Sequence, residues 1–140
     1  MLLKDKLSLV TGAARGLGEA IARRMAAEGA HVLVVDRDLE PAQRVAASIR
    51  AAGGRADADS VDVSDAAAVD ALAARIAAAH GDIDVLVNNA GISARSKFDE
   101  PGAREAWDRV LSVNLQGVFN VTQAFVPALK RTHGSIVNLS

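Results

Sequence analysis

Three glycines, Gly12, Gly16 and Gly18, stand where this sequence could bind an anion. They follow an apolar run at residues 7–10 and precede residues 19–25, whose apolar members recur at helical spacing. A strand, a glycine turn and a helix are therefore expected in succession. The first turn of a helix carries unpaired N–H groups and the positive end of the helix dipole, and glycine lets a ligand approach the backbone closely. This pattern predicts a phosphate-binding turn; a tight turn that binds nothing is the alternative.

The glycine spacing is Gly-x-x-x-Gly-x-Gly, whereas the common dinucleotide pattern is Gly-x-Gly-x-x-Gly; Ile21 occupies the place of the last glycine. Asp36 ends the next apolar run, 18 residues after Gly18. An acidic residue roughly 20 residues beyond the glycines typically accepts hydrogen bonds from the adenosine ribose. A carboxylate there would repel the extra phosphate of NADP by on the order of 4 kcal/mol at an effective dielectric constant of 20. We therefore expect NAD, with NADP less favoured, although Arg15 or Arg37 could neutralise that phosphate.

Alternating strands and helices must position these residues. Apolar runs predict strands at residues 7–10, 31–36, 83–88 and 135–140, and a third strand in chain order that ends near Val63. Helices are expected after Asp38 and Ser64 as N-caps and over about residues 103–130, where Pro127 should kink the last turn. Such alternation predicts an α/β fold with a doubly wound, Rossmann-like parallel sheet in the order 3-2-1-4-5. Its ligand would lie beyond the carboxyl ends of strands 1 and 4.

Composition narrows the class of protein. The chain has 140 residues, a formal net charge of -1 and 3% aromatic residues, so we expect one domain and no nucleic-acid or anionic membrane partner. The absence of cysteine excludes a disulfide framework and a thiolate metal site. No signal peptide or apolar run of membrane-spanning length is present, and we expect a cytoplasmic protein.

Several motifs occur together in one order along the chain. They are Thr11-Gly12-x-x-x-Gly16-x-Gly18, Asp62-Val63, Asn88-Asn89-Ala90-Gly91, Ser112-Val113-Asn114-Leu115 and the strand from Gly134 to Ser140. The whole chain thereby resembles the short-chain dehydrogenase/reductase family, and the Asn-Asn-Ala-Gly tetrapeptide is the most specific element. The resemblance implies an NAD-dependent oxidoreductase that transfers a hydride between the nicotinamide and an alcohol or carbonyl substrate. Residues 1–140 would be its dinucleotide-binding domain.

The resemblance, together with the charge argument for the two arginines, assigns cofactor contacts to the residues around the glycine turn and at the ends of strands 2, 3 and 4. It implies that the turn holds the pyrophosphate, the acid after strand 2 the ribose, and the pair after strand 3 the adenine. Thr11 and Asn88 would tie strand 1 to strand 4. The expected cofactor-binding residues are Gly12, Arg15, Gly16, Leu17, Gly18, Asp36, Arg37, Asp62, Val63, Asn89, Ala90, Gly91 and Val113.

Asn114 is the expected catalytic residue. Asparagine in a helix interior costs propensity and competes for backbone hydrogen bonds, so its presence needs a reason. In the family the matching residue belongs to a tetrad of Asn, Ser, Tyr and Lys and helps to hold a water on a proton relay. The alternative is a polar residue at a helix–sheet contact.

The sequence departs from the family in its acid–base residues. It contains no tyrosine, and the family's catalytic serine would fall one position beyond Ser140. We therefore expect a domain that is C-terminally incomplete relative to the family and inactive as a 140-residue chain. The alternatives are a non-catalytic dinucleotide-binding or oligomerisation module and, more weakly, an adenosyl-methionine site. A homo-oligomer is expected because the family commonly pairs its long helices.

The three histidines, His31, His80 and His133, are expected at a strand start, a helix end and a turn. Surface or helix-cap positions explain them, and no group of potential ligands has the spacing of a metal site. Ser93 and Ser96 lie in the polar loop after strand 4 without an evident base. No metal site is therefore predicted.

Overall fold

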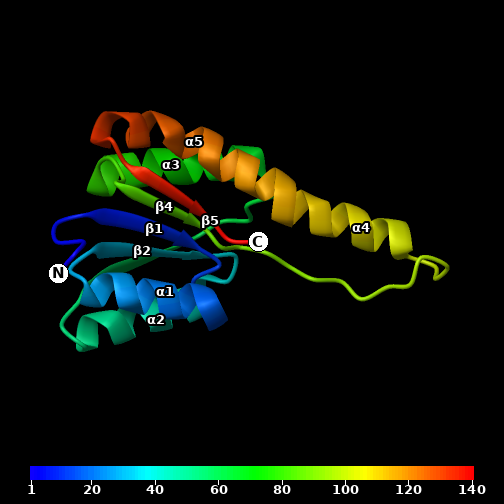
Figure 1. Cartoon of the computed structure of the whole chain (residues 1–140), viewed down its shortest axis with the longest axis horizontal. Coiled ribbons are helices and arrows are strands. Elements are labelled where there is room, and N and C mark those ends of the chain that lie inside the picture. The colour runs from blue at the N-terminus through cyan, green and yellow to red at the C-terminus, as the bar shows by residue number, and fades with distance from the viewer.

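A computed structural model describes residues 1–140 as one parallel sheet between two layers of helices (Figure 1). The sheet order is β3-β2-β1-β4-β5, which confirms the predicted α/β, doubly wound topology. The strands are β1 (Leu7–Thr11), β2 (His31–Asp36), β3 (Arg55–Ser60), β4 (Val85–Asn88) and β5 (Ser135–Asn138). The helices are α1 (Gly16–Ala27), α2 (Leu39–Ala51), α3 (Ala66–His80), α4 (Ala103–Leu111), the π-helical segment η1 (Ser112–Gln116) and α5 (Gly117–Thr132).

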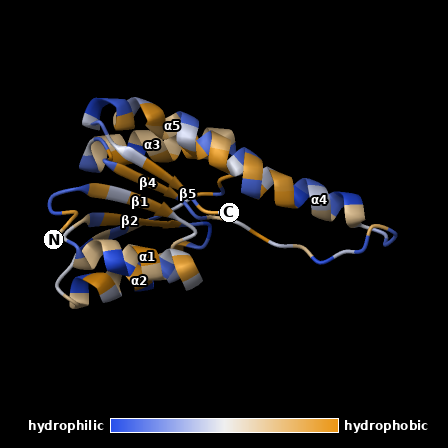
Figure 2. Ribbon diagram, viewed as in Figure 1, coloured by the Kyte–Doolittle hydropathy of each residue, from blue (hydrophilic) through white to orange (hydrophobic).

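Each face of the sheet buries its own apolar core. Leu9, Leu33 and Leu86 face α3 and α5, where they contact large side chains such as Phe125. On the other face, valines of β1 and β2 pack on α1 and α2, whose buried residues are mainly alanines. Small side chains let these two helices lie close to the sheet. Because the central strands are covered on both faces, most of their residues are apolar, as Figure 2 shows for β1 and β4.

The sheet has two functionally different edges. We call the edge where the strands begin the amino edge and the edge where they end the carboxyl edge. The chain moves outward from β1 to β2 and β3, and then returns to place β4 on the other side of β1. This reversal leaves a crevice at the carboxyl edge between β1 and β4. Figure 1 also shows that α4 and the segment before it extend away from the sheet.

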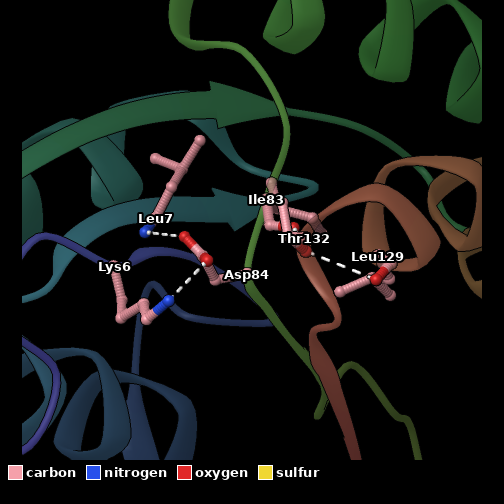
Figure 3. A network of polar contacts seen from close by, with 6 residues as sticks. All are labelled: Lys6, Leu7, Ile83, Asp84, Leu129 and Thr132. Carbon is pink, nitrogen blue, oxygen red and sulfur yellow. Dashed lines mark hydrogen bonds and ion pairs between the residues drawn. The ribbon is translucent and has the colours of Figure 1, made fainter.

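The amino edge is closed by polar contacts. Asp84 accepts hydrogen bonds from the Leu7 backbone N–H at 2.9 Å and from Lys6 Nζ at 3.0 Å (Figure 3). The Thr132 hydroxyl, at the end of α5, contacts the carbonyl oxygens of Ile83 at 2.9 Å and Leu129 at 3.3 Å. These contacts join the starts of β1 and β4 to the helix that precedes β5.

Of the two predicted helix caps, Asp38 is in the expected place but lacks a capping bond, and the prediction of Ser64 was wrong. Asp38 is the N-cap of α2, but its side chain makes no capping bond because it pairs with Arg15 at 2.8 Å. The N-cap of α3 is Asp65, whose carboxylate accepts from the Ala68 N–H at 3.0 Å. Ser64, the expected cap, instead donates its hydroxyl to Asp62 at 2.6 Å.

The third strand and the long helix also differ from their predicted forms. β3 ends at Ser60 rather than near Val63, because Asp62 accepts the N–H of Ser64 and turns the chain. The long helix changes from α to π geometry at Ser112–Gln116, and α5 continues through Pro127 to Thr132. None of the helices is both long enough and apolar enough to span a membrane.

Candidate cofactor-binding cleft

A cleft of about 410 Å³ lies at the carboxyl edge, beyond the ends of β1, β2 and β4. Residues from the glycine turn, from the ends of β2 and β3 and from the segment after β4 form its walls. All of the expected cofactor-binding residues except Gly16 line it, and Gly16 lies within the turn between them. The lining residues are Thr11, Gly12, Arg15, Leu17, Gly18, Val35, Asp36, Arg37, Asp38, Val61, Asp62, Val63, Asn89, Ala90, Gly91, Ile92 and Val113.

The glycine turn is shaped by two distinct requirements. Gly12 and Gly16 have positive φ angles of 62° and 56°, which L side chains adopt only at a cost. Gly18 has no room for a side chain, because a Cβ there would clash with the Gly12 carbonyl oxygen and with Asn89 Nδ2. A Cβ at Gly16 would meet no atom within 4 Å. Packing therefore fixes Gly18, while Gly16 faces open space.

The first turn of α1 fits an anionic group. Its N-cap, Arg15, makes no side-chain capping bond, and the N–H groups of Gly16, Leu17 and Gly18 have no protein acceptor. Free N–H groups and the positive end of the helix dipole attract negative charge. With the open space at Gly16, these donors form a site that suits the pyrophosphate of a dinucleotide.

Asp36 is held at the end of β2 by the backbone. Its two carboxylate oxygens accept the N–H groups of Ala14 and Asp38, each at 3.1 Å. This contact fixes the carboxylate beside the glycine turn, where it lines the cleft. The exposed Arg15 guanidinium is engaged by Asp38, so a ligand phosphate would compete with a carboxylate for it.

Asp62 and Val63 line the cleft after β3, as expected for the adenine side. The Ser64 hydroxyl, which donates to the carboxylate, holds the pKa of Asp62 below its ordinary value, and the positive charge of Arg37 adds to this effect. Asp62 is thus a stable anion next to a cation.

Asn88, the last residue of β4, and Asn89, the residue after it, divide the expected contacts differently from the prediction. Thr11 does tie β1 to β4, since its buried hydroxyl oxygen accepts the N–H groups of Asn89 at 3.1 Å and Ala90 at 3.0 Å. The Asn88 amide, however, donates to Thr122 of α5 at 3.1 Å and to Asn138 of β5 at 2.8 Å. The side chain that bonds to β1 is that of Asn89, which donates to the carbonyl oxygens of Thr11 and Gly12. Asn88 therefore faces the other neighbour of β4.

Asn114 lies in the π-helical segment and is exposed. Its Oδ1 accepts the Ile92 N–H and its Nδ2 donates to the Ile92 carbonyl oxygen, both at 2.8 Å. This paired contact fixes the chain beyond Gly91 against the helix, next to Val113 in the cleft wall. Segments of π geometry occur often at functional sites. The contact is a positioning one, and a catalytic role for Asn114 stays a prediction.

Sequence reasoning missed Asn120, a buried residue of α5. Its Nδ2 donates to the Val63 carbonyl oxygen at 2.9 Å, and its Oδ1 accepts from Gln116. Gly117 also lies against Val63, since a Cβ at Gly117 would come within 2.6 Å of Val63 Cγ2. The argument applied to Asn114, that asparagine in a helix interior needs a partner, would also have found Asn120.

The topology and the cleft together define a doubly wound fold of the dinucleotide-binding class. The family model of short chain dehydrogenases matches residues 6–140, and the chain therefore belongs to the short-chain dehydrogenase family. It is 41% identical over 138 residues to the 2,3-dihydro-2,3-dihydroxybenzoate dehydrogenase of Bacillus subtilis (strain 168), with 98% of this chain and 52% of that protein covered.

Two solved structures share the fold closely. A metagenomic short-chain oxidoreductase in complex with NADP has a TM-score of 0.91 and 39% identity over 100% of this chain and 64% of that chain. A gluconate 5-dehydrogenase from Burkholderia cenocepacia J2315, in complex with NADP and tartrate, has a TM-score of 0.89 and 40% identity over 97% and 53% of the two chains. The match to the Bacillus relative covers 52% of that protein, so the chain spans about half of its length.

Proposed function

We propose that this chain binds a nicotinamide dinucleotide in the carboxyl-edge cleft and serves as the cofactor-binding part of a dehydrogenase acting on an alcohol or carbonyl group. The observation that carries the proposal is the uncapped first turn of α1, whose free N–H groups adjoin the open space at Gly16. The bound nicotinamide would supply hydride transfer. The family match and the two NADP-bound structural relatives support this class of ligand.

Each wall of the cleft would bind one part of the dinucleotide. The N–H groups of Gly16 and Leu17 would hold the pyrophosphate, and the fixed carboxylate of Asp36 would accept the ribose hydroxyls. Asp62 and Val63 would border the adenine. The segment from Asn89 to Gly91, with Val113, would border the nicotinamide ribose, chiefly through backbone groups because the Asn89 amide is already bonded to the glycine turn.

We further propose that NAD is preferred over NADP. Asp36 lies where the extra 2′-phosphate would meet a like charge, and Arg15, which could offset that charge, is paired with Asp38. Arg37 favours the other outcome, as do the NADP complexes of the two structural relatives. Titration of the purified chain with both cofactors decides between them. We expect NAD to bind at least about tenfold more tightly, which corresponds to about 1.4 kcal/mol.

A pair of glycine variants tests the proposed site. Gly16 and Gly53 both have positive φ angles, and a Cβ at either meets nothing within 4 Å. Alanine should therefore strain both positions equally, by about 1 kcal/mol. Only Gly16→Ala would place a methyl group where the phosphates approach. We expect it to weaken NAD binding at least about tenfold in calorimetric titrations, a loss of about 1.4 kcal/mol.

Gly53→Ala lies in the turn after α2, away from the cleft, and should bind NAD like the wild type. Equal losses in the two variants, or no NAD binding by the wild-type chain, would refute the proposed phosphate site.

Catalysis is tested separately. These 140 residues contain no tyrosine, and we propose that they do not reduce NAD by themselves; turnover by the purified, mass-verified chain would overturn this.

A second function is favoured by the exposed apolar face of the long helix. Trp107, Leu115 and Phe119 are 57%, 66% and 58% exposed, and exposed apolar patches of this kind commonly mark protein interfaces. We propose that a second copy of this chain covers them in a homo-oligomer. Sedimentation velocity of the wild type should show a dimer or larger species, and Trp107→Glu should shift it to the monomer.

A further inference from the structure

Three potential metal ligands meet at the amino edge, on the side of the sheet opposite to the cleft. They are His31 at the start of β2, Asp57 in β3 and His80 at the end of α3. One donor atom of each lies within 4.8 Å of the donors of the other two. His31 Nε2 is 2.7 Å from Asp57 Oδ2, and the two imidazole rings are 5.2 Å apart in an edge-on arrangement.

The fold explains why residues so far apart in sequence converge. In the register of β2 and β3, His31 lies opposite Arg55 and Leu33 lies opposite Asp57. Successive side chains of a strand alternate between faces. His31 and Asp57 therefore share the face of Leu33, which packs in the core with α3. The last residue of α3 completes the group.

We propose that His31, Asp57 and His80 bind a divalent transition-metal ion of the zinc class. Two imidazole nitrogens and one carboxylate oxygen are donors that Zn²⁺ accepts, while Mg²⁺ and Ca²⁺ prefer sets made of oxygen alone. Zinc binds such donors at about 2.0–2.2 Å, which places tetrahedral ligand atoms about 3.3 Å apart. The His31–Asp57 pair would open slightly and His80 would move inward, both by side-chain rotation.

The charges around the group favour a cation. Asp59, the next carboxylate on the same face of β3, is paired with Arg75 at 3.0 Å. Arg55 contacts Asp5 and the Gly29 carbonyl oxygen. Asp57 has no lysine or arginine partner; its ion-pair partner is His31, which is charged only when protonated. The carboxylate is therefore available to a metal ion when the histidines are neutral.

A simple ion pair between His31 and Asp57 needs one imidazole and does not involve His80. The edge-on packing of the His80 ring brings a second imidazole donor within 4.8 Å of the other two ligand atoms. The side chains of His31 and Asp57 are 26% and 50% exposed, so an ion can reach them from solvent. A bound ion would join β2, β3 and the end of α3 and thereby stabilise the outer part of the sheet.

Calorimetric titration of the chain with Zn²⁺ tests this proposal. We expect one saturable site with micromolar affinity, no comparable binding of Mg²⁺, and at least a tenfold loss of Zn²⁺ affinity in His80→Gln. His133→Asn is the matched control, since it removes an exposed imidazole outside the group. Asparagine tolerates the positive φ of 53° at that position.

Thermal unfolding supplies a readout of the site's effect on folding. Saturating Zn²⁺ should raise the Tm of the wild type and of His133→Asn by about 5 °C, because the ion binds the folded chain. It should leave the Tm of His80→Gln and Asp57→Asn nearly unchanged. Asp57→Asn keeps a hydrogen-bonding side chain opposite His31 and serves as the second variant if His80→Gln folds poorly. Absence of saturable Zn²⁺ binding by the wild type, or equal affinity in His80→Gln and His133→Asn, would overturn the proposal.

Discussion

At the carboxyl edge the N–H groups of Gly16 and Leu17 have no protein acceptor, whereas at the amino edge the Asp84 carboxylate accepts hydrogen bonds from Lys6 Nζ and the Leu7 N–H. Both edges are rich in polar residues and are built on the same strands. At the amino edge the side chains of Asp84 and Thr132 bond to backbone groups at the start of β1 and just before β4 (Figure 3). At the carboxyl edge the Thr11 and Asn89 side chains bond to the backbone around the glycine turn, and the first N–H groups of α1 stay free.

This difference shows how the fold keeps a binding surface in shape without filling it. The glycine turn is held from behind by the Thr11 hydroxyl and the Asn89 amide, which bond to backbone groups of β1, of the turn and of the segment after β4. A site supported in this way is preformed for its ligand.

Gly18→Ala should have the largest effect on stability, because it attacks this support directly. The added Cβ would clash with the Gly12 carbonyl oxygen and with Asn89 Nδ2, and a clash with backbone atoms cannot be relieved by rotating a side chain. We expect a loss of about 3 kcal/mol in the free energy of unfolding, measured with urea. Gly53→Ala, at an open position of the amino edge, is the control and should lose about 1 kcal/mol. Equal losses would mean that the turn tolerates displacement.

Two threonine-to-valine changes compare the edges at equal side-chain volume. Thr11→Val removes the acceptor of the Asn89 and Ala90 N–H groups in a buried place, and unsatisfied buried donors are costly. We expect a loss of about 2–3 kcal/mol from urea unfolding. Thr132→Val, at the amino edge, removes a hydroxyl beside the Ile83 carbonyl oxygen and should lose only about 1 kcal/mol. A larger loss for Thr132→Val would reverse the comparison.

The sequence was sufficient to predict the sheet order and most of the cleft. Gly12 directly follows β1, and Asp36 ends β2. In a parallel sheet the ends of such apolar strands meet at one edge. The pattern of Asn88 and Asn89 was recognised, but the bond to β1 was expected from Asn88 and is made by Asn89. Adjacent residues point to opposite sides of a strand end, and nothing in the local sequence states which side faces β1.

Other features depend on tertiary contacts that have no local signal. Ser64 and Asp65 are both acceptable helix caps, and the choice between them follows from Asp62, which binds Ser64. The grouping of His31 with His80 requires the register of β2 and β3 and the length of α3. Spacing along the chain therefore does not reveal this group of potential ligands, which only the fold brings together.

The smallest expected effect concerns two carboxylates, Asp82 and Asp62, whose pKa values are lowered by different kinds of partner. At the amino edge, hydrogen bonds from Arg131, both at 2.7 Å, hold the pKa of Asp82 below its ordinary value of 3.8. At the carboxyl edge, the Ser64 hydroxyl is the main cause of the lowered pKa of Asp62. In both cases the folded state binds the proton less tightly than the unfolded chain. Each contribution to stability is therefore present above the unfolded pKa and is lost as the pH falls through the folded pKa.

Salt should distinguish the two carboxylates in NMR titrations of their side chains. Concentrated NaCl screens the attraction between exposed charges but has less effect on a hydrogen bond from a neutral hydroxyl. We expect the pKa of Asp82 to rise toward its ordinary value in 1 M NaCl and in Arg131→Gln, while the pKa of Asp62 rises mainly in Ser64→Ala. If salt raised the pKa of Asp82 and Asp62 equally, the positive charge of Arg37, rather than the Ser64 hydroxyl, would be the main cause of the lowered pKa of Asp62. The carboxylates of the two edges would then be stabilised in the same way.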